Sequence, residues 1–454
     1  MSERAAAVDP DAPDPLVLAE YAPGTSAVLR DEERWPTLDD TGRTRLARWR
    51  QHPDAPDWVH ATGDRLTPEQ IERVRHPLVV DGWLEDHLAV ARRLIRFRRS
   101  TGLDTLEDFP TTTRADLVAD LGAFVPLDAD LDRMLHGTSS GSTGAALVIP
   151  DDVEEVARGF HLLRDLVRGE GIDWEPDGER LALAHVVFQA QAFTYVSLIS
   201  SFAHRAMARV NLHEQAWGDP GARARFLAAA DPQVITGHPT SLGELLRPEV
   251  RAAVRPLALF SSAMALAAPL RRRLQDAFAC PVFDVYGLHE TRPIAVRTDD
   301  GPFRILNRRV HVEVLDAAGA PVPAGEMGEI VVTAGENPLL PLVRYRTGDV
   351  GRLVTLPDGT PGLADIEGRA HVVFRAASGR AVASVELTQH LQAHGALGWV
   401  VEQSADGAIA ATVAGGDAEA AGRALSALLE RPVVVRRVER LADLGEGKPR
   451  RYRA

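Results

Sequence analysis

The sequence predicts an α/β protein: a large N-terminal α/β domain with parallel sheets and a β-barrel-like subdomain, plus a small C-terminal α+β domain. Three observations predict this class. Short apolar segments alternate with helical patterns in the middle of the chain, period-two segments joined by Gly and Pro turns occupy residues 303–356, and a mixed segment follows Gly368. Strands alternating with helices favour parallel pairing, whereas period-two segments joined by turns favour antiparallel hairpins or a barrel.

The N-terminal third predicts an arm followed by helices. The first 35 residues are rich in Pro, Ala and Asp, a composition typical of a flexible arm. Apolar residues at helical spacing over residues 66–100 predict two helices, divided by Pro77. The segment LEDFPTTTRADL (106–117) predicts a turn and then a short helix whose N-cap is Thr112 or Thr113.

The middle and the end of the chain supply the sheet and the smaller domain. The predicted buried strands are short and apolar: 232–235, 254–260 and 282–285. Alternating segments predict antiparallel strands at 310–314 and 329–332. After Gly368 comes an α+β segment of about 85 residues that ends in basic residues. We therefore expect three parts: the arm (1–35), an N-terminal domain (36–367) and a C-terminal domain (368–454).

Composition excludes several classes of protein. The net charge of −13 argues against a protein that tracks a nucleic-acid backbone, because phosphate affinity needs a basic surface. No apolar run is long enough for a membrane helix, and the polar, acidic N-terminus lacks the apolar core of an export signal. The single cysteine, Cys280, excludes an internal disulfide and a Cys-cluster zinc site. These features predict a cytoplasmic protein.

The first chemical motif is GTSSGSTG at residues 137–144. Its three glycines allow close approach of the backbone to an anion, and its five hydroxyls add donors that can surround a polyphosphate. It is not a Walker A loop, because no lysine follows Gly144. A surface turn of the same composition is the alternative.

The second motif, DVYGLHET (284–291), follows a predicted strand. Tyr286, with Gly287 after it, can lay its ring against a base, and Glu290 can reach an Mg²⁺ ion bound to phosphates. The third motif, RYRTGD (344–349), places Asp349 after a tight turn, where it can accept both hydrogen bonds of a ribose diol. A buried Tyr with a solvated Glu, and an ordinary hairpin turn, are the alternatives.

The fourth motif, EGKPRR (446–451), contains the only lysine. Of 51 basic residues, Lys448 alone is a lysine and the others are arginines. A solvated basic tail is the common meaning of such a run. A lysine placed at random would reach this position only about once in 450 times, which serves as a check on chance motif matches.

The four motifs, in this order, resemble the ANL superfamily of adenylate-forming enzymes. Within this superfamily, the chain is most similar to the phenylacetate–CoA ligase branch. LEDFPTTTRADL resembles the entry segment of that branch. HGTSSGSTG resembles its phosphate loop, VYGLHE its Tyr-Gly-x-x-Glu motif, RYRTGD its ribose motif and EGKPRR its C-terminal lysine motif. The resemblance runs from about residue 90 to the C-terminus.

The resemblance implies a role for each matching position. ATP would be bound by the phosphate loop, the adenine platform, the ribose carboxylate and a nucleotide contact: Thr138, Ser139, Ser140, Gly141, Ser142, Thr143, Gly144, Tyr286, Gly287, Asp349 and Arg369. Glu290 would bind Mg²⁺. Lys448 would bridge the attacking acid oxygen and the α-phosphate, delivered by the C-terminal domain acting as a lid.

Two departures from the family pattern concern the hinge and the acid pocket. His371 stands where relatives carry a hinge aspartate, and Phe260-Ser-Ser-Ala-Met264 stands where relatives often carry a Gly/Ala-Glu pair. His289 and Arg292 flank Glu290 and can contact an anionic substrate, or they can satisfy the local fold. We assign six residues to the acid pocket: Phe188, His238, Ser262, Ala263, His289 and Arg292.

The resemblance implies adenylation of a carboxylic acid, with an aromatic acid favoured by the branch, followed by transfer to CoA. ATP and Mg²⁺ are the expected cofactors, and CoA is the expected co-substrate. The expected binding partner is a small-molecule acid, and a homodimer is compatible with the sequence. One alternative is a biosynthetic enzyme that transfers the activated group to a carrier protein, an amine or another small nucleophile. A related alternative is activation of a small oxyanion such as nitrite in place of a carboxylic acid. A non-catalytic nucleotide-binding homologue is a further alternative, which the presence of Glu290, Asp349 and Lys448 at the motif positions disfavours. The sequence leaves the identity of the acid and of the acceptor open.

Overall fold

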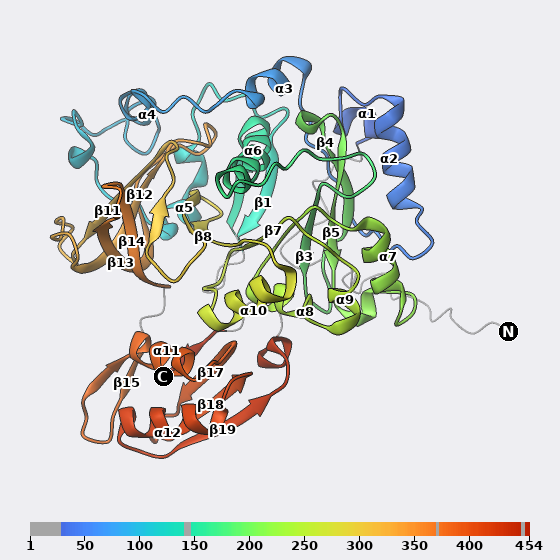
Figure 1. The fold of residues 1–454 in the computed structure, drawn as a ribbon. Helices are drawn as coiled ribbons and strands as arrows, with labels where there is room; N and C mark the ends of the chain where they lie inside the picture. Colours follow the sequence, from blue (N-terminus) through green and yellow to red (C-terminus); the bar gives the residue numbers. More distant parts are fainter. Residues whose placement is uncertain (1–28, 140–146, 369–371, 446–449) are drawn as a thin grey trace, which may run out of the picture.

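The computed structural model describes residues 29–139, 147–368, 372–445 and 450–454. In Figure 1 the chain forms a large upper part and a smaller C-terminal part beneath it. None of the helices in the described stretches combines the length and the apolar character needed to span a bilayer.

Residues 29–124 contain five helices and two 3₁₀ turns: α1 Asp31–Arg34, α2 Asp40–Arg50, α3 Pro68–Arg75, α4 Trp83–Ala91, η1 Leu106–Asp108, α5 Arg114–Ala119 and η2 Leu121–Phe124. The prediction of two helices on either side of Pro77 is confirmed by α3 and α4. Thr113 is the N-cap of α5, and its side chain and that of Asp116 form a capping box.

The predicted arm is too long at its C-terminal end. Residues 31–34 are helical, and Trp35 is fully buried with its indole Nε1 donating to the carbonyl of Leu198 at 3.1 Å. Burial of so large a ring outweighs the Pro- and Asp-rich composition around it. Residues 1–28, the rest of the predicted arm, lie outside the described residues.

A 12-stranded sheet forms the centre of the upper part, in the order β11-β12-β13-β14-β10-β9-β8-β7-β6-β3-β5-β4. Its parallel half consists of short apolar strands plus one antiparallel edge strand, β4: β3 Leu183–Val187, β4 Tyr195–Ile199, β5 Arg205–Asn211, β6 Val234–Gly237, β7 Ala258–Ser261 and β8 Val282–Leu288. Both faces of these strands are covered, which explains their continuous apolar runs.

Helices and turns connect these strands: α6 Val153–Gly169, η3 Ser200–Phe202, η4 Glu214–Ala216, α7 Ala222–Ala230, α8 Pro239–Glu244, α9 Pro248–Arg251 and α10 Ala268–Phe278. Three of them, α8, α9 and α10, have proline in the first helical turn, where its missing N–H is not needed. The predicted β–α alternation is confirmed at β6–α8 and β7–α10.

The antiparallel strands extend the same sheet. They are β9 Arg292–Arg297, β10 Phe303–Ile305, β11 Val310–Leu315, β12 Met327–Ala334, β13 Leu342–Thr355 and β14 Pro361–Glu367. β8 pairs in parallel with β7 and antiparallel with β9, so it is the strand at which the sheet changes character. The hairpins predicted for the barrel-like subdomain are thus present, and β8 joins them directly to the parallel half.

A separate hairpin stands beside the sheet. It consists of β1 Leu135–Ser139 and β2 Leu147–Asp151, which pair antiparallel from Leu135↔Asp151 to Ser139↔Leu147. Figure 1 shows it next to α6 and close to β8.

The C-terminal part contains its own sheet, in the order β19-β18-β17-β20. Its elements are β15 Val373–Arg375, β16 Ala381–Ala383, α11 Ser384–Ala393, β17 Gly398–Gln403, β18 Ile409–Ala414, α12 Ala418–Leu429, β19 Val433–Val438, η5 Leu441–Leu444 and β20 Tyr452–Arg453. Its core is continuous with the upper part, because Leu441 packs so closely on α8 that a Cβ at Gly243 would lie 2.5 Å from it.

Candidate active site

The predicted pocket residues gather at one edge of the parallel half. β3, β6, β7 and β8 run in the same direction, and each is followed at its carboxyl end by predicted residues: Phe188 after β3, His238 after β6, Ser262 and Ala263 after β7, and His289 and Glu290 after β8. Ligands of open α/β sheets bind in the crevice outside the carboxyl ends of the strands. The arrangement therefore places these residues where a small substrate is expected.

Glu290 is the point at which three sequence motifs meet. Its carboxylate is 3% exposed, accepts a hydrogen bond of 2.7 Å from the Tyr345 hydroxyl, and lies 3.8 Å from Nη1 of Arg114. Tyr345 belongs to RYRTGD on β13, and Arg114 begins α5 in the LEDFPTTTRADL segment. Thr112 fixes these two segments together: its N–H donates to the Arg344 carbonyl at 3.0 Å and its carbonyl accepts from the Arg346 N–H at 2.7 Å.

Asp349 and Tyr286 form a second contact between motifs. The Tyr286 hydroxyl donates to Oδ2 of Asp349 at 3.0 Å, and the Asp349 N–H donates to Oγ1 of Thr347 at 3.0 Å. Gly348, between Thr347 and Asp349 in the sequence, has φ +75°, a left-handed conformation that favours glycine. The predicted adenine platform and ribose carboxylate are thus in direct contact.

Neither Tyr345 nor Arg114 was singled out from the sequence, although both lie inside quoted motifs. A signal existed for Tyr345. Residues two and four positions apart in a regular strand share a face, and Tyr345, Thr347 and Asp349, at alternate positions of RYRTGD, are all buried. For Arg114 no comparable signal exists, since Arg114 and Glu290 lie far apart in the sequence.

The predicted phosphate loop is carried by the β1–β2 hairpin. Residues 140–146 lie outside the described residues, so Ser140, Gly141, Ser142, Thr143 and Gly144 have no described position, and Thr138 and Ser139 are described as the end of β1. The base of the hairpin is described. Asp151, the last residue of β2, is 6% exposed and lies in contact with residues that flank Glu290.

His289 and Arg292 both face this base. Nη2 of Arg292 lies 2.5 Å from Asp151 and 2.8 Å from Glu155, and Nε2 of His289 lies 3.6 Å from Asp151. Burial raises the pKa of Glu155 to about 7, although the guanidinium of Arg292 opposes this shift. Both described contacts of the Arg292 guanidinium are therefore with carboxylates of the protein itself.

Three predicted residues of the lid and hinge, Lys448, Arg369 and His371, lie outside the described residues. Arg451, three residues after Lys448, contacts the upper part. Nη2 of Arg451 donates to the carbonyl of Ala265 at 2.5 Å, in the loop that follows β7, and its guanidinium lies 4.6 Å from the centroid of the Trp399 ring.

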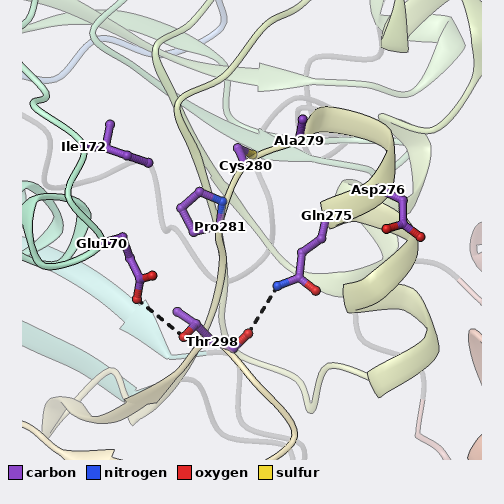
Figure 2. A pocket seen from close by; sticks show the side chains of 8 residues that line it. All are labelled: Glu170, Ile172, Gln275, Asp276, Ala279, Cys280, Pro281 and Thr298. Atoms are coloured by element: carbon purple, nitrogen blue, oxygen red, sulfur yellow. Dashed lines mark hydrogen bonds between the residues drawn. The ribbon is translucent and has the colours of Figure 1, made fainter.

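One hollow among the described residues lies away from this site. It measures about 420 Å³ and is lined by Glu170, Ile172, Gln275, Asp276, Ala279, Cys280, Pro281 and Thr298. Figure 2 shows Cys280 and Pro281 beside it, immediately before β8 begins, whereas Glu290 follows the other end of that strand. Burial raises the pKa of the Cys280 thiol to about 12, so the single cysteine is no nucleophile at neutral pH.

Comparison with known proteins indicates the class of enzyme to which this site is similar. A family model described as AMP-binding enzyme matches residues 170–337, which contain the parallel half and Glu290. A phenylacetate-coenzyme A ligase of Pseudomonas putida is 26% identical over 65% of this chain and 68% of that protein. One of Escherichia coli (strain K12) is 25% identical, over 56% of this chain and 58% of its own length.

The fold has counterparts among solved structures. The structure of 2-hydroxyisobutyryl-CoA ligase in the postadenylation state, in complex with R3-HIB-AMP, has a TM-score of 0.58 and 18% identity, and the match covers 84% of this chain and 88% of that one. Fold, motif contacts and sequence relatives together define an AMP-forming ligase. These similarities support an adenylate-forming enzyme of the ANL superfamily.

Proposed function

We propose that the protein uses ATP to activate a carboxylic acid as an acyl-AMP and then transfers the acyl group to CoA, giving a thioester. The observation that carries the proposal is the meeting of three motifs at Glu290, through Tyr345 and Arg114. The phenylacetate-coenzyme A ligases among the relatives support an acid and a thiol acceptor, and they favour an aromatic acid. In this proposal residues 36–367 carry the substrates and residues 368–454 form a lid.

The residues at the site fit a magnesium ion held jointly with the substrate. Within the described stretches no three His, Cys, Asp or Glu side chains gather as a complete metal site. Mg²⁺ usually takes only one or two protein carboxylates and completes its shell with substrate phosphates and water. One buried carboxylate, Glu290, oriented by Tyr345, meets that need. When bound, the ion would neutralise charge on the phosphates of ATP.

The protein groups then have distinct tasks. Asp349 accepts hydrogen bonds from the ribose, and the Tyr286 ring, whose hydroxyl contacts Asp349, lies against the adenine. An acid is already ionised at neutral pH, so its oxygen attacks the α-phosphorus without a general base and pyrophosphate leaves. Lys448 neutralises the charge shared by the attacking oxygen and the α-phosphate. In the second step the CoA thiol sulfur attacks the acyl carbon and AMP leaves.

The position of the C-terminal part supports a role for Lys448. Arg451, three residues further along the chain, contacts the loop after β7, and that loop also contains the predicted pocket residues Ser262 and Ala263. The amide of Ala268, at the start of α10, donates to Oε1 of Gln392 on α11 at 3.0 Å. Two elements of the C-terminal part thus hold the stretch of chain that borders the acid pocket.

A panel of aliphatic and aromatic acids with ATP and Mg²⁺ tests the proposal. AMP and pyrophosphate would be measured with and without CoA, and Glu290→Gln, which keeps the side-chain shape, serves as the inactive control. We expect at least one acid to release pyrophosphate and CoA to increase AMP formation. Release that responds only to a carrier protein or an amine would replace CoA as the acceptor. Silence with every acid would refute adenylation of a carboxylic acid.

A further inference from the structure

The ring of His289 fills the space beside Gly137, the first residue of the GTSSGSTG motif. A Cβ at Gly137 would lie 2.4 Å from Cε1 and 2.5 Å from Nε2 of His289, well inside van der Waals contact. Gly137 lies in β1, opposite Ile149, with an ordinary extended backbone. This glycine is therefore needed for the close approach of the ring rather than for an unusual φ angle.

The other side of the same hairpin base is held by charge. Asp151, on β2, accepts a hydrogen bond of 2.5 Å from Arg292, and Nη2 of Arg292 also lies 2.8 Å from Oε2 of Glu155, in the first turn of α6. The two carboxyl-bearing residues are 6% and 5% exposed. A buried ion pair of this kind is costly to break, because one partner would be left charged without compensation.

Backbone strain at Arg292 indicates how firmly this contact is held. Arg292 has φ +66°, in the left-handed region that residues with a Cβ rarely adopt. Such a conformation persists where the surroundings enforce it. Here the surroundings are the two carboxylates, together with Asn337, whose Nδ2 donates to the carbonyl of Pro150 at 2.8 Å and fixes the residue before Asp151.

These contacts join the described base of the β1–β2 hairpin to the segment that contains Glu290. Glu290 lies between His289 and Arg292 in the sequence, and both neighbours contact the base of the hairpin that carries the phosphate loop. We infer that His289 and Arg292 are positioning residues, which hold the β1–β2 hairpin in register with Glu290 so that the phosphates of ATP meet both. They act through Gly137 and Asp151 and do not contact the acid. The inference rests on the proposed function, because it assigns ATP to this site.

Direct measurement of ATP binding separates the inference from the activity. For Arg292→Met and Asp151→Asn we expect the Kd of ATP, measured by equilibrium dialysis, to rise about 10- to 100-fold, as is typical when a group that orients a binding residue is removed. The KM of the acid stays unchanged. A rise in the KM of the acid with an unchanged Kd of ATP would overturn the inference and make Arg292 a substrate contact. No change in either would overturn it as well.

Arg223→Met is the matched control. Arg223 is 4% exposed on α7, lies 3.0 Å from Glu249, and donates to the carbonyl of Leu212 at 2.6 Å. Loss of this pair should lower the melting temperature while leaving the Kd of ATP and the KM of the acid unchanged. If Arg223→Met weakens ATP binding as much as Arg292→Met does, the effect is general destabilisation and the inference fails.

A second test does not depend on breaking an ion pair. Gly137→Ala introduces the clash with His289 and should weaken ATP binding, whereas Gly137→Ala combined with His289→Ala should bind ATP within about twofold of His289→Ala alone, since additivity holds only for independent sites. Independent, additive effects of the two substitutions would overturn the inference. A further outcome is that the parent protein binds ATP and yet releases no pyrophosphate with any of the acids tested. In that case the proposed function fails, but the measurements of ATP binding still decide the inference.

Discussion

Replacement of Tyr345 by Phe removes one oxygen atom and, with it, the hydroxyl that orients Glu290. The bond is 2.7 Å long, both residues are buried, and the acceptor is a carboxylate. A hydrogen bond to a charged group contributes about 1.5–3 kcal/mol. At about 1.4 kcal/mol for each factor of ten, that range corresponds to roughly 10- to 150-fold in an equilibrium constant.

The loss should appear in the dependence on magnesium. Removing a group that orients a metal ligand typically weakens metal binding about 10- to 100-fold, which agrees with the range set by the bond itself. We expect the half-saturating Mg²⁺ concentration for pyrophosphate release to rise by that factor in Tyr345→Phe, at a fixed and saturating ATP concentration. The rate at saturating Mg²⁺ should fall much less.

Tyr286→Phe provides a matched comparison, because it removes the same atom from a hydroxyl that contacts Asp349 instead of Glu290. We expect it to raise the KM of ATP and to leave the Mg²⁺ midpoint close to that of the parent. Superimposable Mg²⁺ titrations of Tyr345→Phe and the parent would refute the assignment of Glu290 as the metal ligand.

Three further predictions concern the lid and stability. Lys448→Arg should slow acyl-AMP formation by about 10²-fold or more, because a planar guanidinium cannot replace a compact ammonium between two oxygens. Transfer from a supplied acyl-AMP should be spared. The two half-reactions would be measured separately, and equal damage to both would contradict this role. Arg451→Met removes the contact with Ala265 and should slow adenylation about tenfold, as expected for one charged hydrogen bond; unchanged rates of pyrophosphate release would show that the contact does not serve adenylation. Burial raises the pKa of the Asp64 carboxyl from 3.8 to about 6, so the folded state favours the protonated form. The contribution of Asp64 to the free energy of unfolding is therefore complete below about pH 4 and is lost as the pH rises through 6. Relative to the parent, Asp64→Asn should therefore gain about 3 kcal/mol in the free energy of unfolding between pH 4 and pH 7, at about 1.4 kcal/mol per unit, and parallel pH profiles in urea denaturation would refute this.

The sequence was sufficient for features that depend on neighbours in the chain. Pro77 marked the break between α3 and α4, and the apolar runs marked β6 and β7. The start of α5 was predicted at Thr112 or Thr113, and the N-cap is Thr113. Local chemistry determines these features: a missing N–H, a capping hydroxyl, a strand buried on both faces. The order of the motifs likewise sufficed to predict the class of enzyme.

The contacts within the site could not be predicted in the same way. Arg292 and Asp151 are 141 positions apart, and Tyr345 and Glu290 are 55 apart. No periodicity connects residues so distant, and the charge of Arg292 was compatible both with a substrate contact and with an internal ion pair. Trp35 shows the same limit, because a single buried ring placed the end of the predicted arm inside the protein.

The double pairing of β8 has a consequence for redesign of the enzyme. On its parallel side lie the strands that lead to Phe188, His238 and Ser262, and on its antiparallel side lies the part of the sheet that contains β13 and Asp349. The residues predicted to select the acid and the residues predicted to hold the nucleotide are therefore carried by opposite flanks of one shared strand. A library that varies only the residues after β3, β6 and β7 would explore new acids while the nucleotide machinery of the parent is retained, whereas recombination with a homologue within β8 would separate Tyr286 from the surroundings in which it evolved.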